Sequence, residues 1–436
     1  MRNLFVVAEL LDKCVRAILA ERVDGKVVVY GSEEEPFSDK TVFDENGVLE
    51  NFSKVNSVLL SISKKMENRA VNYYDNQKVN LTCIDLAVSC FPCNTFVSSN
   101  SCPLNPSLTI NKDLIDALKQ SNQQADYSNE DIEVQCLNES YVLDGVELDD
   151  IQNRHGNSLT INNLSIRYPK KLAENLRKCG ERCTFSLNFN FSPIMESYAY
   201  ISKQQMEKGI ALVSLHSNYS SVVIYNKSKL QHLAVIPFGW NDVYNDLKFF
   251  FVQNGTEELK SKVDKINYKD LIDKTLHSDK NVIIKICECP LDIKKIQDVI
   301  KYRLKEILSF ANQEVLKFQE NAEKEFSIAI LTEIEQQDVL NIAHDVFGSD
   351  KCFVPTVLSD LCLGGAGLPL NYAPLLGLAS IADDNSAFEV VETAEMEEKP
   401  FEAPKKTSPK KEKGTFRKFG GIFEGLFSGD NNENNE

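Results

Sequence analysis

The stretch GIALVSLHSNYSSVVIYNKSKLQHLAVIPFGWNDVYNDL, residues 209–247, decides the fold of this 436-residue chain. Its apolar run over 210–215 predicts a buried strand that leads into the polar turn His216-Ser217-Asn218-Tyr219. Two further strands are predicted over 221–225 and 232–237, with a short turn between them, and a Gly and a helix follow. The unit from which we build the fold is therefore three strands joined by short turns and followed by a helix.

The same order of elements opens the chain. Residues 4–8, 15–21 and 26–30 predict three strands, with Asp24-Gly25 as a hairpin turn. Apolar residues at helical spacing then predict a helix over 48–66. This internal repetition predicts an α/β chain with two related lobes.

Residues 80–166 predict a separate unit between these two repeats. Its expected elements are strands over 81–88, 131–137 and 158–168 around a helix over 112–121. Later in the chain, 290–320 predict an amphipathic helix, 327–332 a buried strand, and 339–347 a helix that ends at Gly348.

The composition excludes several classes of protein. A net charge of −16 argues against general nucleic-acid binding, which needs a basic surface that displaces counterions. The sequence contains no run of 18 apolar residues, so no transmembrane helix is predicted. The N-terminus lacks the long apolar run and the cleavage site of a signal peptide. A cytoplasmic protein is expected.

The twelve cysteines leave two interpretations open. Cys179 and Cys183 could meet Cys287 and Cys289 to hold a metal ion, since zinc sites combine two such pairs. Ordinary buried thiols in a reducing cytosol are the interpretation that we favour, so no metal is expected.

The C-terminal part has a charge pattern that is typical of a disordered linker. Residues 389–402 carry six Glu and one Lys, and residues 405–418 carry six Lys, one Arg and one Glu. An amphipathic segment follows. On a helical projection its apolar residues fall within an arc of about 140°, with Arg417 and Lys418 opposite. The apolar residues are Phe416, Phe419, Ile422, Phe423, Leu426 and Phe427.

This segment predicts a membrane-binding helix. Its three glycines disfavour a helix free in water by ~1 kcal/mol each. Six apolar side chains at up to ~1.5–3 kcal/mol each offset that cost once they are buried, and the preceding basic residues attract anionic lipid. The alternatives are a helix docked on the core and a protein-binding motif.

Several short segments resemble the bacterial cell-division family FtsA, actin-like adapters. They include Tyr141-Val-Leu-Asp-Gly145, Ser192-Pro193-Ile194, the run 229–239 with Val243 and Asp246, the run 298–308, and the amphipathic end. These segments occur in the same order as in the family, and the resemblance covers nearly the whole chain. The resemblance implies an actin-like fold of duplicated ribonuclease-H-like lobes with an inserted α+β subdomain.

The resemblance also implies a division of the chain. Residues 1–79 would form the first lobe, completed by 167–190 and 360–384, and 80–166 the inserted subdomain. Residues 191–359 would form the second lobe, with a smaller subdomain near 240–325. A disordered linker over 385–414 and an amphipathic membrane helix over 415–428 would follow.

The chain departs from the family at all three nucleotide motifs. The family's two phosphate loops fall on residues 9–14 (ELLDKC) and 214–221 (SLHSNYSS), and its Gly-Gly-Gly adenosine motif falls on 333–335 (EIE). Glycines are needed there because backbone N–H groups must approach phosphate closely. The positions that break the motifs are Leu11, His216, Asn218, Glu333 and Glu335. The family's ATP and Mg²⁺ are therefore not expected here, and neither is catalysis.

Two further positions follow from the resemblance. Arg303 and Glu306 match family positions that contact the C-terminal peptide of the tubulin-like protein FtsZ, although residues at this spacing can simply pair on a solvated helix face. Trp240 replaces a family Gly close to the nucleotide. It either fills the nucleotide's space or is an ordinary core aromatic.

We therefore expect an adapter that binds FtsZ, membrane lipid and further copies of itself at the inner face of the cell membrane. The alternatives are an actin-like adapter of a pilus or secretion platform and an ATP-binding actin-like ATPase. The missing glycines argue against the last.

Overall fold

A computed structural model gives the fold for most of the first 391 residues. It describes residues 2–38, 42–44, 48–89, 93–105, 109–115, 131–148, 150–276, 283–286, 289–319, 325–334, 336–348, 350, 352–359, 361–363, 372–382 and 387–391. These residues all belong to one compact unit that ends at Val391. The predicted membrane helix and most of the predicted linker lie outside them.

The first sheet is built on an antiparallel meander of β1 (Phe5–Leu10), β2 (Cys14–Val23) and β3 (Lys26–Pro36). Asp24 and Gly25 form the predicted hairpin turn, with φ of 52° and 76°. β5 (Cys83–Val88) and β10 (Ser186–Phe191) extend the sheet in parallel beyond β1, and β18 (Cys362–Leu363) pairs with β3. The strand order is β10-β5-β1-β2-β3-β18.

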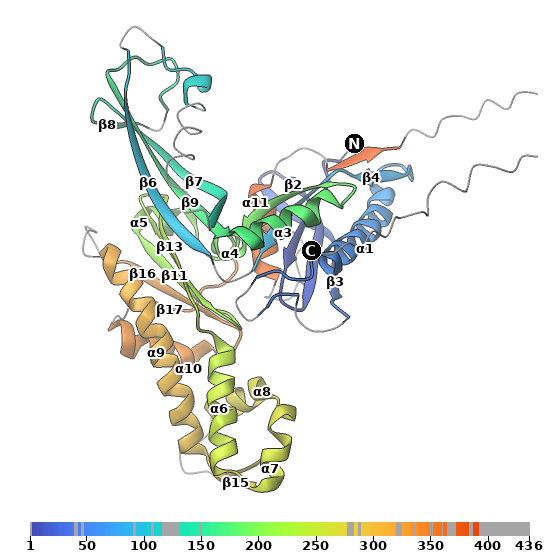
Figure 1. Cartoon of the computed structure of the whole chain (residues 1–436), viewed down its shortest axis with the longest axis vertical. Helices are drawn as coiled ribbons and strands as arrows, with labels where there is room; N and C mark the ends of the chain where they lie inside the picture. Colours follow the sequence, from blue (N-terminus) through green and yellow to red (C-terminus); the bar gives the residue numbers. More distant parts are fainter. Residues whose placement is uncertain are drawn as a thin grey trace, which may run out of the picture. The chain divides into compact units, whose positions relative to one another are not determined.

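The second sheet repeats this arrangement. β11 (Ile210–Leu215), β12 (Ser220–Asn226) and β13 (Lys229–Ile236) form the meander, and β16 (Ser327–Thr332) and β17 (Cys352–Phe353) extend it in parallel. Its order, β13-β12-β11-β16-β17, matches β3-β2-β1-β5-β10 strand for strand. Figure 1 labels β13, β11, β16 and β17 of this sheet. The predicted duplication is confirmed. Both central strands are buried at every residue, which explains their continuous apolar runs.

The inserted sheet is smaller than the sequence suggested. It contains β6 (Asn94–Pro103), β9 (Ser158–Pro169), β7 (Asp131–Leu143) and β8 (Val146–Leu148), in that order. We expected the inserted unit to start at residue 80, and this boundary is wrong, because β5 lies between β1 and β10 in the first sheet. Of the helix predicted over 112–121, only 112–115 are described, and they are helical.

Helices connect and cover the sheets. They are α1 (Phe52–Ala70), α3 (Lys170–Glu181), α4 (Ser192–Tyr200), α5 (Lys203–Lys208), α6 (Trp240–Asn254), α7 (Glu257–Lys262), α8 (Tyr268–Leu276), α9 (Ile293–Gln319), α10 (Gln336–Phe347) and α11 (Ala373–Ile381). Two short 3₁₀ turns cover Val71–Tyr73 and Val263–Lys265. The helix predicted over 339–347 is confirmed, and the one predicted over 290–320 is confirmed for 293–319, whereas 290–292 form part of a strand.

The first helix starts later than predicted. Leu49 forms a β-bridge with Phe43, which holds residues 48–50 outside the helix. The Asn51 side chain then accepts a hydrogen bond from the Lys54 backbone N–H at 3.3 Å and caps α1.

The core also extends further along the chain than predicted. β19 (Phe388–Val390) pairs with β4 (Val79–Leu81), and Phe388 is buried. A linker that starts at residue 385 is therefore wrong for 388–390. The remaining small sheet pairs β14 (Ile283–Ile286) with β15 (Cys289–Asp292).

The helices α4 and α11 cross at Gly377, so a substitution there tests how tightly the first core is packed. A Cβ at Gly377 would lie 1.7 Å from the Met195 carbonyl oxygen, so one backbone must shift. We expect Gly377→Ala to lower the free energy of unfolding by about 1–3 kcal/mol, or to prevent folding, measured by urea denaturation.

The matched control is Gly180→Ala in α3. There the new Cβ would make only ordinary contacts, 3.7 Å from Leu187. Because Ala favours a helix over Gly by ~1 kcal/mol, this variant should be as stable as the parent or more stable. Equal stability of the two variants would contradict the tight crossing.

Candidate functional site

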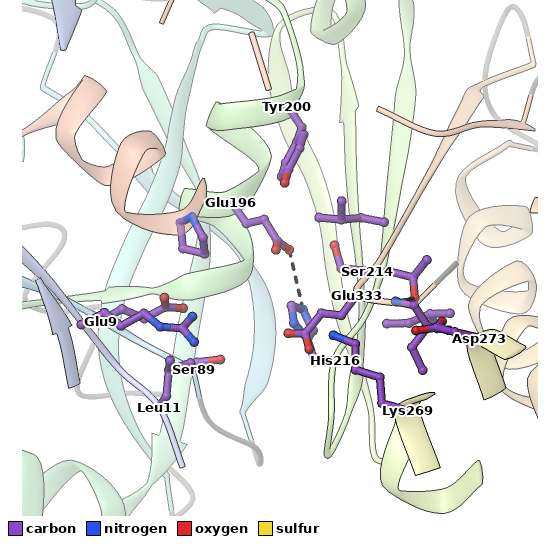
Figure 2. Close-up of a pocket in the computed structure, with 16 residues that line it drawn as sticks. Glu9, Leu11, Ser89, Glu196, Tyr200, Ser214, His216, Lys269, Asp273 and Glu333 are labelled. Atoms are coloured by element: carbon purple, nitrogen blue, oxygen red, sulfur yellow. Dashed lines mark hydrogen bonds and ion pairs between the residues drawn. The ribbon is translucent and has the colours of Figure 1, made fainter. Parts of the chain in front are cut away.

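One candidate site is a cavity of about 630 Å³ at the ends of the two sheets' central strands. β1 contributes Glu9, α4 contributes Glu196, and β11 contributes Ser214 (Figure 2). β11 and β16 run parallel with Leu215 opposite Thr332, so the turns that follow both strands reach the same wall. Further lining comes from Arg16, His216, Lys269, Asp273 and Glu333.

Glu9 is a buried carboxyl at the floor of this cavity, only 2% exposed. Its Oε1 accepts a hydrogen bond from the Ser192 hydroxyl at 2.6 Å, and its Oε2 has no hydrogen-bond partner. Burial raises the pKa of Glu9 to about 7, because the charged form loses its solvation. The Ser192 hydrogen bond and Arg16 oppose this shift.

Glu196 is a second buried carboxyl in the same cavity. Burial raises its pKa to about 8, and the charges of Glu9 and Glu333 add to the shift. The Ser214 hydroxyl lies near enough to oppose it, although the Ser214 Oγ and Glu196 Oε2 atoms complete no hydrogen bond of normal geometry. Two carboxyls that share one buried space therefore disfavour each other's ionisation.

His216 adds no positive charge at neutral pH. Burial lowers its pKa to about 4, because the imidazolium would lose its hydration. Its Nε2 lies 3.7 Å from Glu196 Oε2, beyond hydrogen-bond distance, and its ring packs on Tyr219 with centroids 4.5 Å apart.

The turn between β11 and β12 forms hydrogen bonds with the start of α6. Its carbonyl oxygens at His216 and Ser217 accept hydrogen bonds from the first N–H groups of α6, at 2.9 and 2.8 Å. A Cβ at Gly239 would lie 2.4 Å from the His216 carbonyl oxygen, so only glycine allows this approach. The N-terminal N–H groups of α6 therefore have protein partners.

Side chains also join this turn to the first lobe. The Asn218 amide donates to the Asp12 carboxylate in the turn after β1, and Ser89 and Tyr219 share a hydrogen bond of 2.9 Å. Where the resemblance places two phosphate loops, this chain has two turns that contact each other.

The residues that break the nucleotide motifs have different positions. Leu11, His216 and Glu333 line the cavity, Asn218 forms the bridge to Asp12, and Glu335 lies outside the described residues. Trp240 is buried in the second core, where its indole N–H donates to Thr332 Oγ1 at 3.1 Å. It is an ordinary core aromatic at the end of β16.

A second site is a groove between α6 and α9, which lie side by side (Figure 1). Its volume is about 630 Å³. Phe249 from α6 and Tyr302 from α9 line it and are 66% and 75% exposed. Exposed aromatic rings of this size on facing helices are typical of a binding surface.

Arg303 crosses the floor of this groove. Its Nε and Nη2 donate to the two Asp246 oxygens at 2.7 and 2.9 Å, and its Nη1 donates to Glu306 at 2.7 Å. The pKa of Arg303 is raised, chiefly by its hydrogen bond to Asp246. The sequence left open whether Arg303 and Glu306 pair, and they do. Their contact with FtsZ stays a prediction.

Sequence comparison finds relatives of one kind. Cell division protein FtsA of Escherichia coli (strain K12) is 25% identical over 154 residues, which cover 34% of this chain and 36% of that protein. FtsA of Bacillus subtilis (strain 168) is 24% identical over 132 residues, 30% of each chain. The matches therefore span about a third of these relatives' length. No family model matches the chain.

Structural comparison extends the likeness over most of the chain. A chain of the PilM-PilN type IV pilus biogenesis complex superposes with a TM-score of 0.55 and 11% identity, covering 87% of this chain and 99% of that one. At this identity the likeness concerns the fold alone. This chain is similar to FtsA over about a third of its sequence and has an actin-like fold.

Other predicted sites of the FtsA-like chain are only partly described. Cys179 and Cys289 lie in separate hydrophobic cores and Cys287 is outside the described residues. Within the described part, no cluster of three or more His, Cys, Asp or Glu could hold a metal ion. Among the same residues, no helix is long and apolar enough to span a membrane. The predicted membrane-binding residues 416–427 are not described.

Sequence reasoning missed the two features that dominate these sites. Glu196 stands alone among apolar residues in SPIMESYAY, and such a lone acid in an apolar segment was the available signal. The aromatic pair Phe249 and Tyr302 had no comparable signal, because it forms only when α6 and α9 pack together.

The buried carboxyls predict a loss of stability at alkaline pH. Because the folded pKa values of Glu9 and Glu196, about 7 and 8, exceed the unfolded value of 4.5, their contribution is full below pH 4.5 and is lost as the pH rises through 7 and 8. We expect the free energy of unfolding to fall by about 3 kcal/mol between pH 6.5 and 9, at about 1.4 kcal/mol per pKa unit.

The double variant Glu9→Gln/Glu196→Gln should remove most of this fall in pH-dependent urea denaturation. His216 contributes mainly below pH 6.5, where its protonation favours the unfolded chain, so it adds little to this fall. Glu207→Gln, an exposed substitution on α5, is the control and should retain the fall. An unchanged pH profile in the double variant would contradict the assignment.

Proposed function

We propose that this chain is a cell-division adapter that binds the C-terminal peptide of FtsZ in the α6–α9 groove and holds it at the membrane through residues 416–427. The observation that carries the proposal is the aromatic groove around Arg303, in a chain whose sequence matches cell division protein FtsA.

The groove has the physical features that a peptide site needs. Full burial of an aromatic side chain is worth about 1.5–3 kcal/mol, and Phe249 and Tyr302 are largely uncovered in the free chain. Few residues carry most of the affinity of such sites, and aromatic and Arg side chains are the commonest among them. An apolar segment of the peptide would cover both rings at once.

Arg303 gives the groove a fixed polar floor. The paired hydrogen bonds to Asp246 hold the guanidinium in one orientation. Three of its five N–H donors are engaged by Asp246 and Glu306, and the other two can donate to a peptide carboxylate or carbonyl. Orientation is thus set before the peptide arrives, which lowers the entropy cost of binding.

We expect Phe249→Ala and Tyr302→Ala each to weaken binding of a fluorescent FtsZ C-terminal peptide at least tenfold, measured by anisotropy. The loss corresponds to about 1.4 kcal/mol or more of buried aromatic surface.

Leu316→Ala is the matched apolar control, because Leu316 is exposed on α9 but lies about 21 Å along the helix from Tyr302. Lys301→Ala, a charge removal on the opposite side of α9 from Arg303, is the electrostatic control. Neither should change the affinity. If the two aromatic variants bind the peptide as tightly as the parent, the groove is not the site.

The membrane part of the proposal rests on the sequence of residues 416–427. The apolar arc contains four phenylalanines, and the basic residues before it would face anionic headgroups. The segment follows a long charged stretch after β19, which gives it the reach to bind a surface apart from the folded core.

We expect the full chain to co-sediment with vesicles that contain phosphatidylglycerol, and a chain shortened at Val391 not to. Phe423→Glu in the full chain should reduce the bound fraction at least tenfold, since it places a charge on the apolar arc. Glu424→Gln, on the opposite side of the predicted helix, is the control and should bind at least as well as the parent. Equal sedimentation of the full and shortened chains would remove the anchor.

The same proposal makes the chain a binding protein without nucleotide turnover. The cavity at the ends of the central strands is lined by Glu9, Glu196 and Glu333, and these acids oppose the approach of phosphate wherever they are ionised. The α6 N-terminus, a type of site that often binds phosphate, donates to backbone carbonyls instead. Self-association and a position at the division site follow from the adapter role and belong to the proposal.

A pilus or secretion-platform adapter is the remaining alternative. Only the fold likeness to the PilM-PilN complex favours it. A shared fold does not establish a shared function. Because the proteins that match in sequence are FtsA proteins, we prefer the division role.

A further inference from the structure

The cavity between the lobes contains three buried oxygen atoms that lack a hydrogen-bond partner. They are Glu9 Oε2, Glu196 Oε2 and Ser214 Oγ, on side chains from three different elements. These residues are 2%, 8% and 1% exposed, and all three line the same cavity (Figure 2). Buried polar groups in folded proteins are normally paired, so these three oxygens are available to accept hydrogen bonds from a ligand.

The charged groups that face these oxygens leave the cavity acidic. Glu333 and Asp273 add carboxylates from the β16 end and from α8. Arg16 is held by Glu34 at 2.8 Å and lies over the Tyr372 ring. Lys269 of α8 also lines the cavity, at an exposed position. His216 is uncharged at neutral pH. Four acids thus line the cavity against Arg16 and Lys269, which favours a ligand that brings hydrogen-bond donors and positive charge.

The arrangement of acids and apolar residues narrows the chemical class. The inner pair, Glu9 and Glu196, is buried, whereas Glu333 is exposed and belongs to the cavity's outer part. Apolar side chains also line the cavity, among them Leu215, Leu331 and Ile334. An ammonium group has three N–H donors, which equals the number of unpaired oxygens at the inner end. Two acidic ends with apolar lining suit a dication with a methylene chain.

We propose that this cavity binds an aliphatic diamine or polyamine, with one ammonium donating to the Glu9, Glu196 and Ser214 oxygens and a second group near Asp273 and Glu333. The site is separate from the α6–α9 groove and does not depend on the FtsZ and membrane proposal.

Binding of such a cation is coupled to proton release. Burial keeps the pKa values of Glu9 and Glu196 near 7 and 8, so both carry protons in part at neutral pH. An ammonium favours their charged forms, while an alkyl amine, like Lys, stays protonated up to about pH 9. Affinity therefore rises from pH 6.5 to 8.5, with protons passing from the carboxyls to the buffer.

The test is calorimetric titration of the full-length protein with putrescine and spermidine, in two buffers of different ionisation enthalpy. We expect saturable binding that is at least tenfold tighter at pH 8.5 than at 6.5, with heat that depends on the buffer. Butylamine, with a single ammonium, should bind at least tenfold more weakly than putrescine. Mg²⁺–ATP under the same conditions should not saturate.

Substitutions distinguish binding in the cavity from nonspecific attraction of a cation to an acidic protein. Glu196→Gln should weaken putrescine at least tenfold and abolish the buffer dependence. Glu333→Gln should weaken putrescine relative to butylamine, because it removes the acid that would hold the second ammonium. Glu207→Gln, an equal change of net charge on the exposed face of α5, should have no effect. Thermal unfolding of each variant verifies its fold.

Two results would overturn the proposal. Putrescine binding of equal strength in the parent and in Glu196→Gln, both folded, would mean that the amine binds elsewhere. Saturable binding of Mg²⁺–ATP that putrescine does not displace would mean that the cavity still recognises phosphate.

Discussion

The docking of α6 on the turn between β11 and β12 is the contact on which both candidate sites depend. The first N–H groups of the helix donate to the turn's carbonyls, and this approach is possible only because Gly239 has no Cβ. The contact fixes the direction in which α6 leaves the second sheet. It thereby places Asp246 and Phe249 against α9 and forms one wall of the groove. At the same time it uses the helix terminus that could otherwise bind an anion.

The cavity shows how a fold can keep its architecture while its chemistry changes. Its walls are the ends of the duplicated central strands, which the hydrophobic cores hold in place. The groups that face inward are carboxyls whose ionisation is disfavoured by burial and by one another. Since strand pairing does not depend on these side chains, the lobes can retain their form whether the turns carry glycines or Leu11 and His216.

Much of the fold could be predicted from local pattern. The apolar runs of β1, β11 and β16, the Asp24-Gly25 turn and the amphipathic α9 follow from residues close in the sequence, and the repetition of strands predicted the duplication. The errors arose where a distant partner decides. The sequence of β5 does not show which sheet it joins, and its pairing with β1 and β10 places it in the first lobe. β19 forms only because β4 lies beside it.

The sequence by itself determined the strand–turn–strand units, the breaks in the three nucleotide motifs, and the amphipathic character of residues 416–427, because each depends on residue type and spacing alone. Only the tertiary structure decided that Arg303 pairs with Asp246, that Phe249 and Tyr302 share a groove, and that Glu9 and Glu196 are buried together. The residues of each pair lie tens to hundreds of positions apart in the sequence. Their contacts and their shared burial therefore exist only after the chain has folded.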